Sequence, residues 1–188
     1  MQREQLLALR QDPPAAGAAG AKQRATYFGR AGRVRPSTSF DVDAAAYLER
    51  DGDHQVLEAW PALTDLQHGD ALALRLDASD EGARAWVEYL DQVAATDLVL
   101  ALAPYTAQPA GTFRLWALAA ARVRLPAHQR VEARHDLIGI RLAQVGLGFG
   151  ADTLAGPVDE DRHLPLAGMT RPNENTRAGL CALVELAG

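Results

Sequence analysis

The sequence predicts an α/β fold with a parallel, partial TIM-barrel-like sheet and flanking helices. Residues 71–77 (ALALRLD) alternate leucines with other residues, which is typical of a strand. Residues 97–104 (DLVLALAP) are continuously apolar and end at a proline, as in a strand buried on both faces. Between them Trp86, Leu90 and Val93 recur at helical spacing. The three segments have the length of a βαβ unit, whose two strands are parallel.

The N-terminal part shows weaker patterns. Residues 1–10 are compatible with a short helix ended by two prolines, and the low-complexity run AAGAAGA (15–21) is typical of a mobile linker. We therefore expect a flexible N-terminal arm (1–23) and a single truncated-barrel domain (24–188). Within that domain we expect short β pieces up to about residue 40. Two helices, 43–50 and 56–66, are expected on either side of a turn at Asp51-Gly52-Asp53.

After the second predicted strand, elements continue to alternate. We expect a helix at 112–123, a strand at 130–136, a helix at 138–147 and a glycine-broken strand and loop at 148–156. A last helix begins near Thr176, and its apolar stripe includes Cys181, which we expect to be inert core.

Composition excludes several classes of protein. At 188 residues and 48% hydrophobic, the chain can bury a sizeable core, and its net charge of -5 counts against nucleic acid or an anionic membrane as a partner. No signal-peptide core and no membrane-length apolar run is visible, so we expect a cytoplasmic protein. The lone cysteine excludes an iron–sulfur cluster or a Cys-rich zinc site held by one chain. The five histidines show no recurring ligand spacing, so no metal site and no cofactor is predicted.

His135 and Asp136 follow the predicted strand 130–136, at the edge where barrels of this type carry their active sites. Together they could act as a general acid or base, or they could cap the next helix. Tyr105 and Thr106 follow the preceding strand, so we expect them at the same edge, where they could contact a ligand.

A glycine-rich turn provides the next candidates, Gly148, Gly150 and Asp152. Glycines allow a backbone to approach a ligand closely, and free N–H groups can hold an anion, although the turn could equally be kept for its geometry. Gln144, on the helix before it, could reach a substrate amide or a backbone carbonyl. Asp161 belongs to an acidic run that reads either as a solvated loop or as a carboxylate near a ligand.

From about residue 88 onward, the order of elements and motifs resembles that of a known family. An alanine-and-arginine helix end (115–124) precedes a strand, a helix with an Ala-Gln pair, the loop FGADTLAG (149–156), an Ala-Gly pair and a final helix ending in Ala-Gly. This succession resembles the C-terminal part of the radical-SAM enzymes of the futalosine (menaquinone) pathway. These are aminofutalosine synthase and the cyclic dehypoxanthine futalosine cyclase, with the deazaflavin synthase subunit as a relative. The matching positions are Gly139, Ala143, Gln144, Phe149, Gly150, Ala151, Asp152, Gly156, Asp161, Ala167, Gly168, Pro172, Thr176, Leu180, Leu183, Ala187 and Gly188.

The chain also departs from that family. Thr153 and Pro157 stand where a second acidic residue and a threonine are usual, and there is no C-x₃-C-x₂-C loop. In radical-SAM enzymes the three thiolates of that loop hold a [4Fe–4S] cluster. The chain thus resembles a truncated barrel without the redox part, and the resemblance implies that the loop around Asp152 and the carboxylate of Asp161 lie near substrate.

Three functional hypotheses follow. The first is a non-catalytic relative that binds a small molecule or a partner protein. The second is an enzyme that uses His135, Asp136, Asp152 and Asp161 in non-radical acid–base chemistry. The third is one subunit of a split radical-SAM enzyme. Because an incomplete barrel has open sheet edges, we also expect a homodimer or a partner that completes the sheet.

Overall fold

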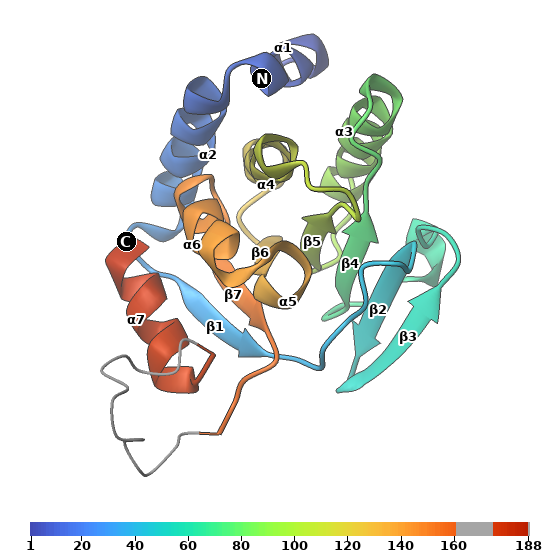
Figure 1. The fold of residues 1–188 in the computed structure, drawn as a ribbon. Helices are drawn as coiled ribbons and strands as arrows, with labels where there is room; N and C mark the ends of the chain where they lie inside the picture. The colour runs from blue at the N-terminus through green and yellow to red at the C-terminus, as the bar shows by residue number, and fades with distance from the viewer. Residues whose placement is uncertain (161–174, 188) are drawn as a thin grey trace.

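The structure is a computed structural model that describes residues 1–160 and 175–187. Its strands form one sheet in the order β1-β7-β6-β5-β4-β2-β3 (Figure 1). The strands are β1 (Arg33–Pro36), β2 (Ala46–Arg50), β3 (Asp53–Leu57), β4 (Ala71–Arg75), β5 (Ala101–Tyr105), β6 (Arg130–Arg134) and β7 (Thr153–Gly156). The helices are α1 (Arg3–Ala8), η1 (Leu9–Gln11), α2 (Pro13–Phe28), η2 (Leu63–Asp65), α3 (Asp80–Ala94), α4 (Gly111–Arg124), α5 (His135–Ile138), α6 (Ile140–Gly148) and α7 (Arg177–Ala187).

The sheet is mostly parallel and strongly curled. Strands β1, β7, β6, β5 and β4 run parallel to one another, and β2 and β3 extend the sheet as antiparallel strands. The curl gives a half-barrel with helices against its outer face (Figure 1). The predicted α/β fold with a partial TIM-barrel-like parallel sheet is confirmed.

The predicted βαβ unit is present as β4-α3-β5, and its helix begins as its sequence indicates. Ser79 is the N-cap, and its hydroxyl accepts a hydrogen bond from the Gly82 amide at 3.0 Å. Trp86, Leu90 and Val93 are fully buried on the side of α3 that faces the core. Alternate strand residues such as Leu72, Leu74, Leu102, Val131 and Leu154 belong to the same core.

The predicted linker at 15–21 is instead part of a helix. Asp12 caps α2 by accepting a hydrogen bond from the Ala15 amide at 3.1 Å, and Pro13 occupies the first turn, where a helix needs no N–H from that residue. A Cβ on Gly20 would lie 2.2 Å from the Phe149 carbonyl oxygen. The small residues therefore let α2 pack closely on the rest of the fold. From composition alone the same residues look like a low-complexity linker.

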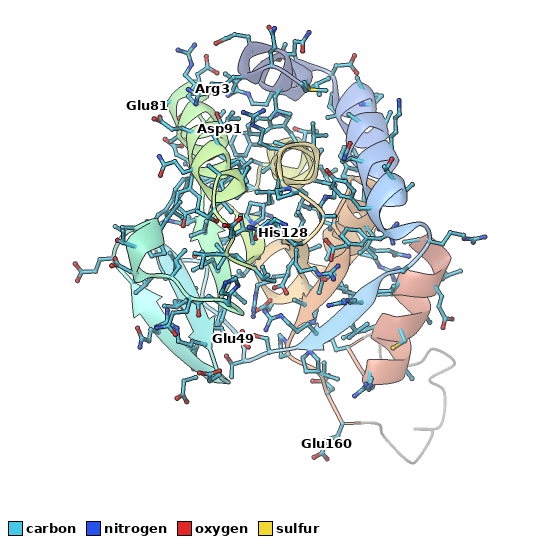
Figure 2. All side chains as sticks on the ribbon, turned by 180° about the vertical axis from the view of Figure 1, so that it is seen from behind. Arg3, Glu49, Glu81, Asp91, His128 and Glu160 are labelled. Atoms are coloured by element: carbon cyan, nitrogen blue, oxygen red, sulfur yellow. The ribbon has the colours of Figure 1, made fainter. Side chains whose placement is uncertain are left out.

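The first residues are also anchored to the fold. Arg3 of α1 donates to Asp91 of α3 at 2.6 Å (Figure 2). Arg124 of α4 donates to the other oxygen of the same carboxylate. The Trp116 indole donates to the Leu6 carbonyl at 2.9 Å. The segment expected to be a free arm thus contacts two helices of the core.

The helices expected at 43–50 and 56–66 are wrong, because most of this region is a β-hairpin. Arg50 pairs with Asp53 across a two-residue loop in which Asp51 and Gly52 have φ of 53° and 89°. An Asp-Gly pair with positive φ at both positions is a favoured tight hairpin turn. The turn was predicted correctly, but the elements beside it are strands, followed by the single turn η2.

Candidate functional site

A cleft opens at the carboxyl-terminal edge of two parallel strands, β4 and β5. It has a volume of about 370 Å³, and its polar lining comes from Arg75, Asp77, Thr106 and Gln108. Arg75 is the last residue of β4, and the other three follow β4 or β5. Because the two strands are parallel, their carboxyl ends bring these side chains to one place.

Three alanines, Ala45, Ala78 and Ala107, line the same cleft. Their short side chains leave the space between the polar groups open. The Ala45 carbonyl accepts a hydrogen bond from the Arg75 amide at 2.9 Å, which fixes the segment before β2 against the end of β4. The cleft is therefore part of the sheet edge and does not depend on a single loop.

The polar groups of the cleft differ in how firmly they are held. The buried Thr106 hydroxyl donates to the Gln108 carbonyl at 2.7 Å and accepts from Arg114 at 2.9 Å, and Arg114 also binds the Thr106 and Gln108 carbonyls. Arg75 donates to the Asp43 carbonyl, and Asp77 accepts from the Ser79 hydroxyl. The loop after β5 is held by these hydrogen bonds, while Arg75, Asp77 and the exposed Gln108 keep hydrogen-bonding capacity for a ligand.

Tyr105, the last residue of β5, is placed at the predicted edge but is used by the fold. Its hydroxyl donates to the Ala44 carbonyl at 2.7 Å, and its ring is buried. Burial raises the pKa of the Tyr105 phenol well above its usual value, so this group is neutral. Through this hydrogen bond Tyr105 fixes the segment before β2, which contributes Ala45 to the cleft lining.

The inner face of the half-barrel is filled by charged side chains. Arg35 of β1 binds both carboxylate oxygens of Glu132 of β6 at 2.6 and 2.7 Å, and it also donates to Glu49 of β2 at 2.7 Å. The other oxygen of Glu49 accepts from the Ser37 hydroxyl at 2.7 Å. Strands β1 and β2 are not neighbours in the sheet, so these contacts cross the concave side. Figure 2 shows Glu49 in this position between the hairpin and β1.

Asp136 belongs to the same network. It accepts from the Arg134 guanidinium at 2.8 Å and from the Phe40 amide at 3.0 Å, and its side chain is almost fully buried. Arg134 lies over the Phe40 ring, 3.7 Å from its centre, and also binds the Ser37 hydroxyl and the Thr38 carbonyl. Asp136 thus ties the end of β6 to the segment after β1.

His135 begins α5, at the carboxyl end of β6, and is only 7% exposed. Its Nε2 atom has no hydrogen-bond partner within the described residues. Burial lowers the pKa of His135, and the positive charge of Arg134 lowers it further against the opposing effects of Asp136 and the Pro157 carbonyl. The ring is closely packed, since a Cβ on Gly156 would lie 2.6 Å from Nε2. His135 is therefore a neutral, enclosed imidazole.

Asp152 lies at the amino-terminal ends of the parallel strands, whereas His135 lies at their carboxyl-terminal ends. Asp152 precedes β7 and accepts from Arg122 at 3.0 Å and from the Val131 amide at 3.0 Å. The structure therefore brings His135 and Asp136 together but separates Asp152 from them by the length of the strands. Gly150 is also at that edge, where its φ of 106° and the close Arg122 side chain require a glycine.

The remaining predicted ligand residues do not line the cleft. Gln144 is half-buried on α6, and Gly148 ends that helix in an exposed position with open space around it. Asp161 lies outside the described residues. Sequence reasoning missed Arg75, Asp77 and Gln108. The alternation of strand 71–77, with its leucines on one face, was the signal that could have singled out Arg75 on the other face, and Asp77 was interpreted only as helix capping.

Among residues 1–160 and 175–187, no group of His, Cys, Asp and Glu side chains is arranged to hold a metal ion. The helices in the same ranges are all too short or too polar to cross a membrane. No protein-family model matches the chain, and no curated protein matches it in sequence.

Proposed function

We propose that this chain is a non-catalytic small-molecule-binding protein, and that its ligand occupies the cleft between the ends of β4 and β5. The observation that supports this proposal most is the cleft itself. Its volume of about 370 Å³ falls within the range of roughly 300–1,000 Å³ usual for ligand pockets, and barrel-type sheets bind ligands at this edge.

The character of the lining supports a polar ligand with both donors and acceptors. Arg75 supplies a cation, Asp77 an anion, and the Gln108 amide one donor group and one acceptor group. Small apolar surfaces of Ala78 and Ala107 lie between them. This mixture suits a flat heteroaromatic or sugar-bearing molecule better than a simple ion.

The environment of the predicted catalytic residues favours binding over acid–base catalysis. Asp136 is committed to Arg134 and the Phe40 amide, and His135 is enclosed against Gly156. A general base must reach the proton it removes, and neither His135 nor Asp136 is among the residues that line the cleft. We therefore propose binding without chemistry.

The ligand class that we propose is a futalosine-type nucleoside, because the C-terminal half resembles radical-SAM enzymes of that pathway. On this view the chain is an accessory protein related to menaquinone biosynthesis. Futalosine is therefore the probe that we choose, and the cleft between the ends of β4 and β5 is the proposed binding site.

Trp60 offers a direct optical test. Its indole donates to the Arg75 carbonyl at 3.0 Å and meets Tyr89 edge to face. Titration of the full chain with futalosine should change tryptophan fluorescence, and calorimetry should give a matching affinity. Trp60→Phe should remove most of the fluorescence change while calorimetric binding persists. No heat and no fluorescence change at millimolar futalosine would contradict the nucleoside proposal.

A further inference from the structure

The amino-terminal edge of the parallel strands holds four arginines around one carboxylate. Arg24 comes from α2, Arg33 from β1, Arg122 from α4 and Arg130 from β6, and Asp152 lies among them. These elements are far apart in sequence, so the fold itself assembles the cluster. It lies at the end of the sheet opposite the cleft described above.

The single carboxylate is already fully used. Asp152 accepts from Arg122 and from the Val131 amide through one oxygen, each at 3.0 Å, and from the Thr153 hydroxyl through the other at 2.9 Å. Arg130 approaches that second oxygen at 3.6 Å. Asp152 can therefore neutralise only part of the positive charge around it.

Two of the arginines are deeply buried and incompletely bonded. Arg24 is 6% exposed and Arg122 is fully buried, and the Nε atom of each lacks a partner in the part of the chain described. Arg24 donates to the Ala31 carbonyl at 3.1 Å, and Arg122 donates to the Gln129, Leu125 and Pro126 carbonyls. Since arginine stays protonated in proteins, four guanidinium groups and one carboxylate leave a local charge of 4 − 1 = +3.

A hollow of about 100 Å³ opens beside these charges. It is lined by Phe28, Ala31, Gly32, Arg33, Arg130 and Asp152. Arg24 does not line the hollow but lies next to one of its lining residues, since a Cβ on Gly32 would lie 3.3 Å from the Arg24 Nη2 atom. The centre of the Phe28 ring lies 5.2 Å from the Arg122 guanidinium and 4.8 Å from the Arg130 guanidinium. Both cations therefore pack against the same aromatic ring.

We infer that this hollow is an anion-binding site for a phosphoryl group. Its size suits one tetrahedral anion, and the planar guanidinium fork matches phosphate oxygens in geometry and charge. The exposed Arg33 at the rim has no acidic partner within ion-pair distance among the described residues. Arg33 and Arg130 contact the anion directly, and Arg24 and Arg122 supply buried positive charge behind it.

The phosphoryl group is either free phosphate or the phosphate of a small phosphomonoester, and two probes distinguish them. Calorimetry and thermal unfolding of the full chain are measured with orthophosphate and with ribose 5-phosphate, and sodium chloride of equal ionic strength serves as the reference. Arg33→Gln and Arg130→Gln test the site. Arg84→Gln, which removes an exposed arginine on α3, is the matched control.

The expected result is a rise in melting temperature with phosphate that chloride does not reproduce. Loss of one charge-assisted contact should weaken binding about tenfold in Arg33→Gln and in Arg130→Gln, with Arg84→Gln unchanged. Equal affinity for both probes assigns the site to the free ion, and tighter binding of ribose 5-phosphate assigns it to an ester. Stabilisation by neither probe, or equal losses in all three variants, would overturn the inference.

Discussion

Arg35 of β1 donates two parallel hydrogen bonds to Glu132 of β6, although strand β7 lies between their strands. The residue of β7 in register with Arg35 is Ala155, whose methyl group leaves room for the long side chain to cross. With Glu49 of β2 as a further partner, Arg35 joins three strands across the concave side. The half-barrel is thus held in its curled shape by a charged network that fills its interior.

Glu132→Gln should lower the free energy of unfolding by about 3 kcal/mol, because Arg35 loses the carboxylate that binds it through two hydrogen bonds in a largely buried place and keeps only Glu49 as a charged partner. Urea unfolding followed by circular dichroism measures this loss. Arg3→Gln breaks the pair with Asp91 at an exposed position, where solvent screens the two charges, and should cost much less than Glu132→Gln. Similar costs for the two variants would show that the inner network does not hold the sheet.

His135 should make the protein less stable as the solution is acidified from pH 7 to pH 5. Its folded-state pKa lies below the ordinary value of 6.5, so the unfolded chain binds the proton more readily. Stability from this group is present above pH 6.5 and is lost as pH falls below it. His135→Asn should flatten the dependence of melting temperature on pH in this interval. His128→Asn is the control, and an equal flattening there would argue against a buried neutral His135.

Glu49 should make stability depend on pH in a more acidic range than His135 does. Burial alone would raise the pKa of this carboxyl group, but hydrogen bonds from Ser37 and Arg35 and the positive charges of Arg35 and Arg134 outweigh burial and lower it. A depressed folded-state pKa gives stability that is present above the ordinary value of 4.5 and is lost as pH falls further. Glu49→Gln should therefore be less stable than the wild type at pH 6, and this difference should shrink by pH 3. A constant difference would contradict the assignment.

Gly20 and Gly148 should respond oppositely to alanine. A Cβ on Gly20 would lie 2.2 Å from the Phe149 carbonyl oxygen, so Gly20→Ala should destabilise the fold by about 2 kcal/mol or more. Gly148 has open space and ends α6, so Gly148→Ala should be neutral or slightly stabilising. Thermal unfolding of both variants tests whether α2 is a packed helix. If Gly20→Ala is neutral, residues 15–21 behave as the linker that their composition predicts.

The sequence predicted the fold best where burial is periodic. Leu72 and Leu74 alternate on β4, and Trp86, Leu90 and Val93 follow a helical spacing, so the βαβ unit was evident. Strand β3 is exposed along most of its length and shows no such alternation, and only its turn was visible. The small residues of α2 look like a linker because their role depends on a distant partner, Phe149.

The candidate site was predictable only in part. The end of β5 identified Thr106, and parallel strands explain why Arg75 and Asp77 join it. Asp152 was grouped with His135 because the resemblance implies that the loop around Asp152 lies near substrate, but the structure places the two residues at opposite ends of the parallel strands. The prediction of a dimer or a sheet-completing partner stays a prediction. It now concerns β3 most directly, because β3 is a sheet edge and its residues are largely exposed.

The most direct test of the central claim is calorimetric titration of futalosine into a variant whose cleft is filled. Ala107→Leu places a larger side chain among the cleft-lining groups at an exposed position, so the fold should be unaffected. Ala182→Leu makes the same change at an exposed position of α7, away from the cleft. We predict that Ala107→Leu abolishes the binding heat and that Ala182→Leu retains the wild-type affinity. Unchanged binding by Ala107→Leu would contradict the assignment of the ligand to this cleft.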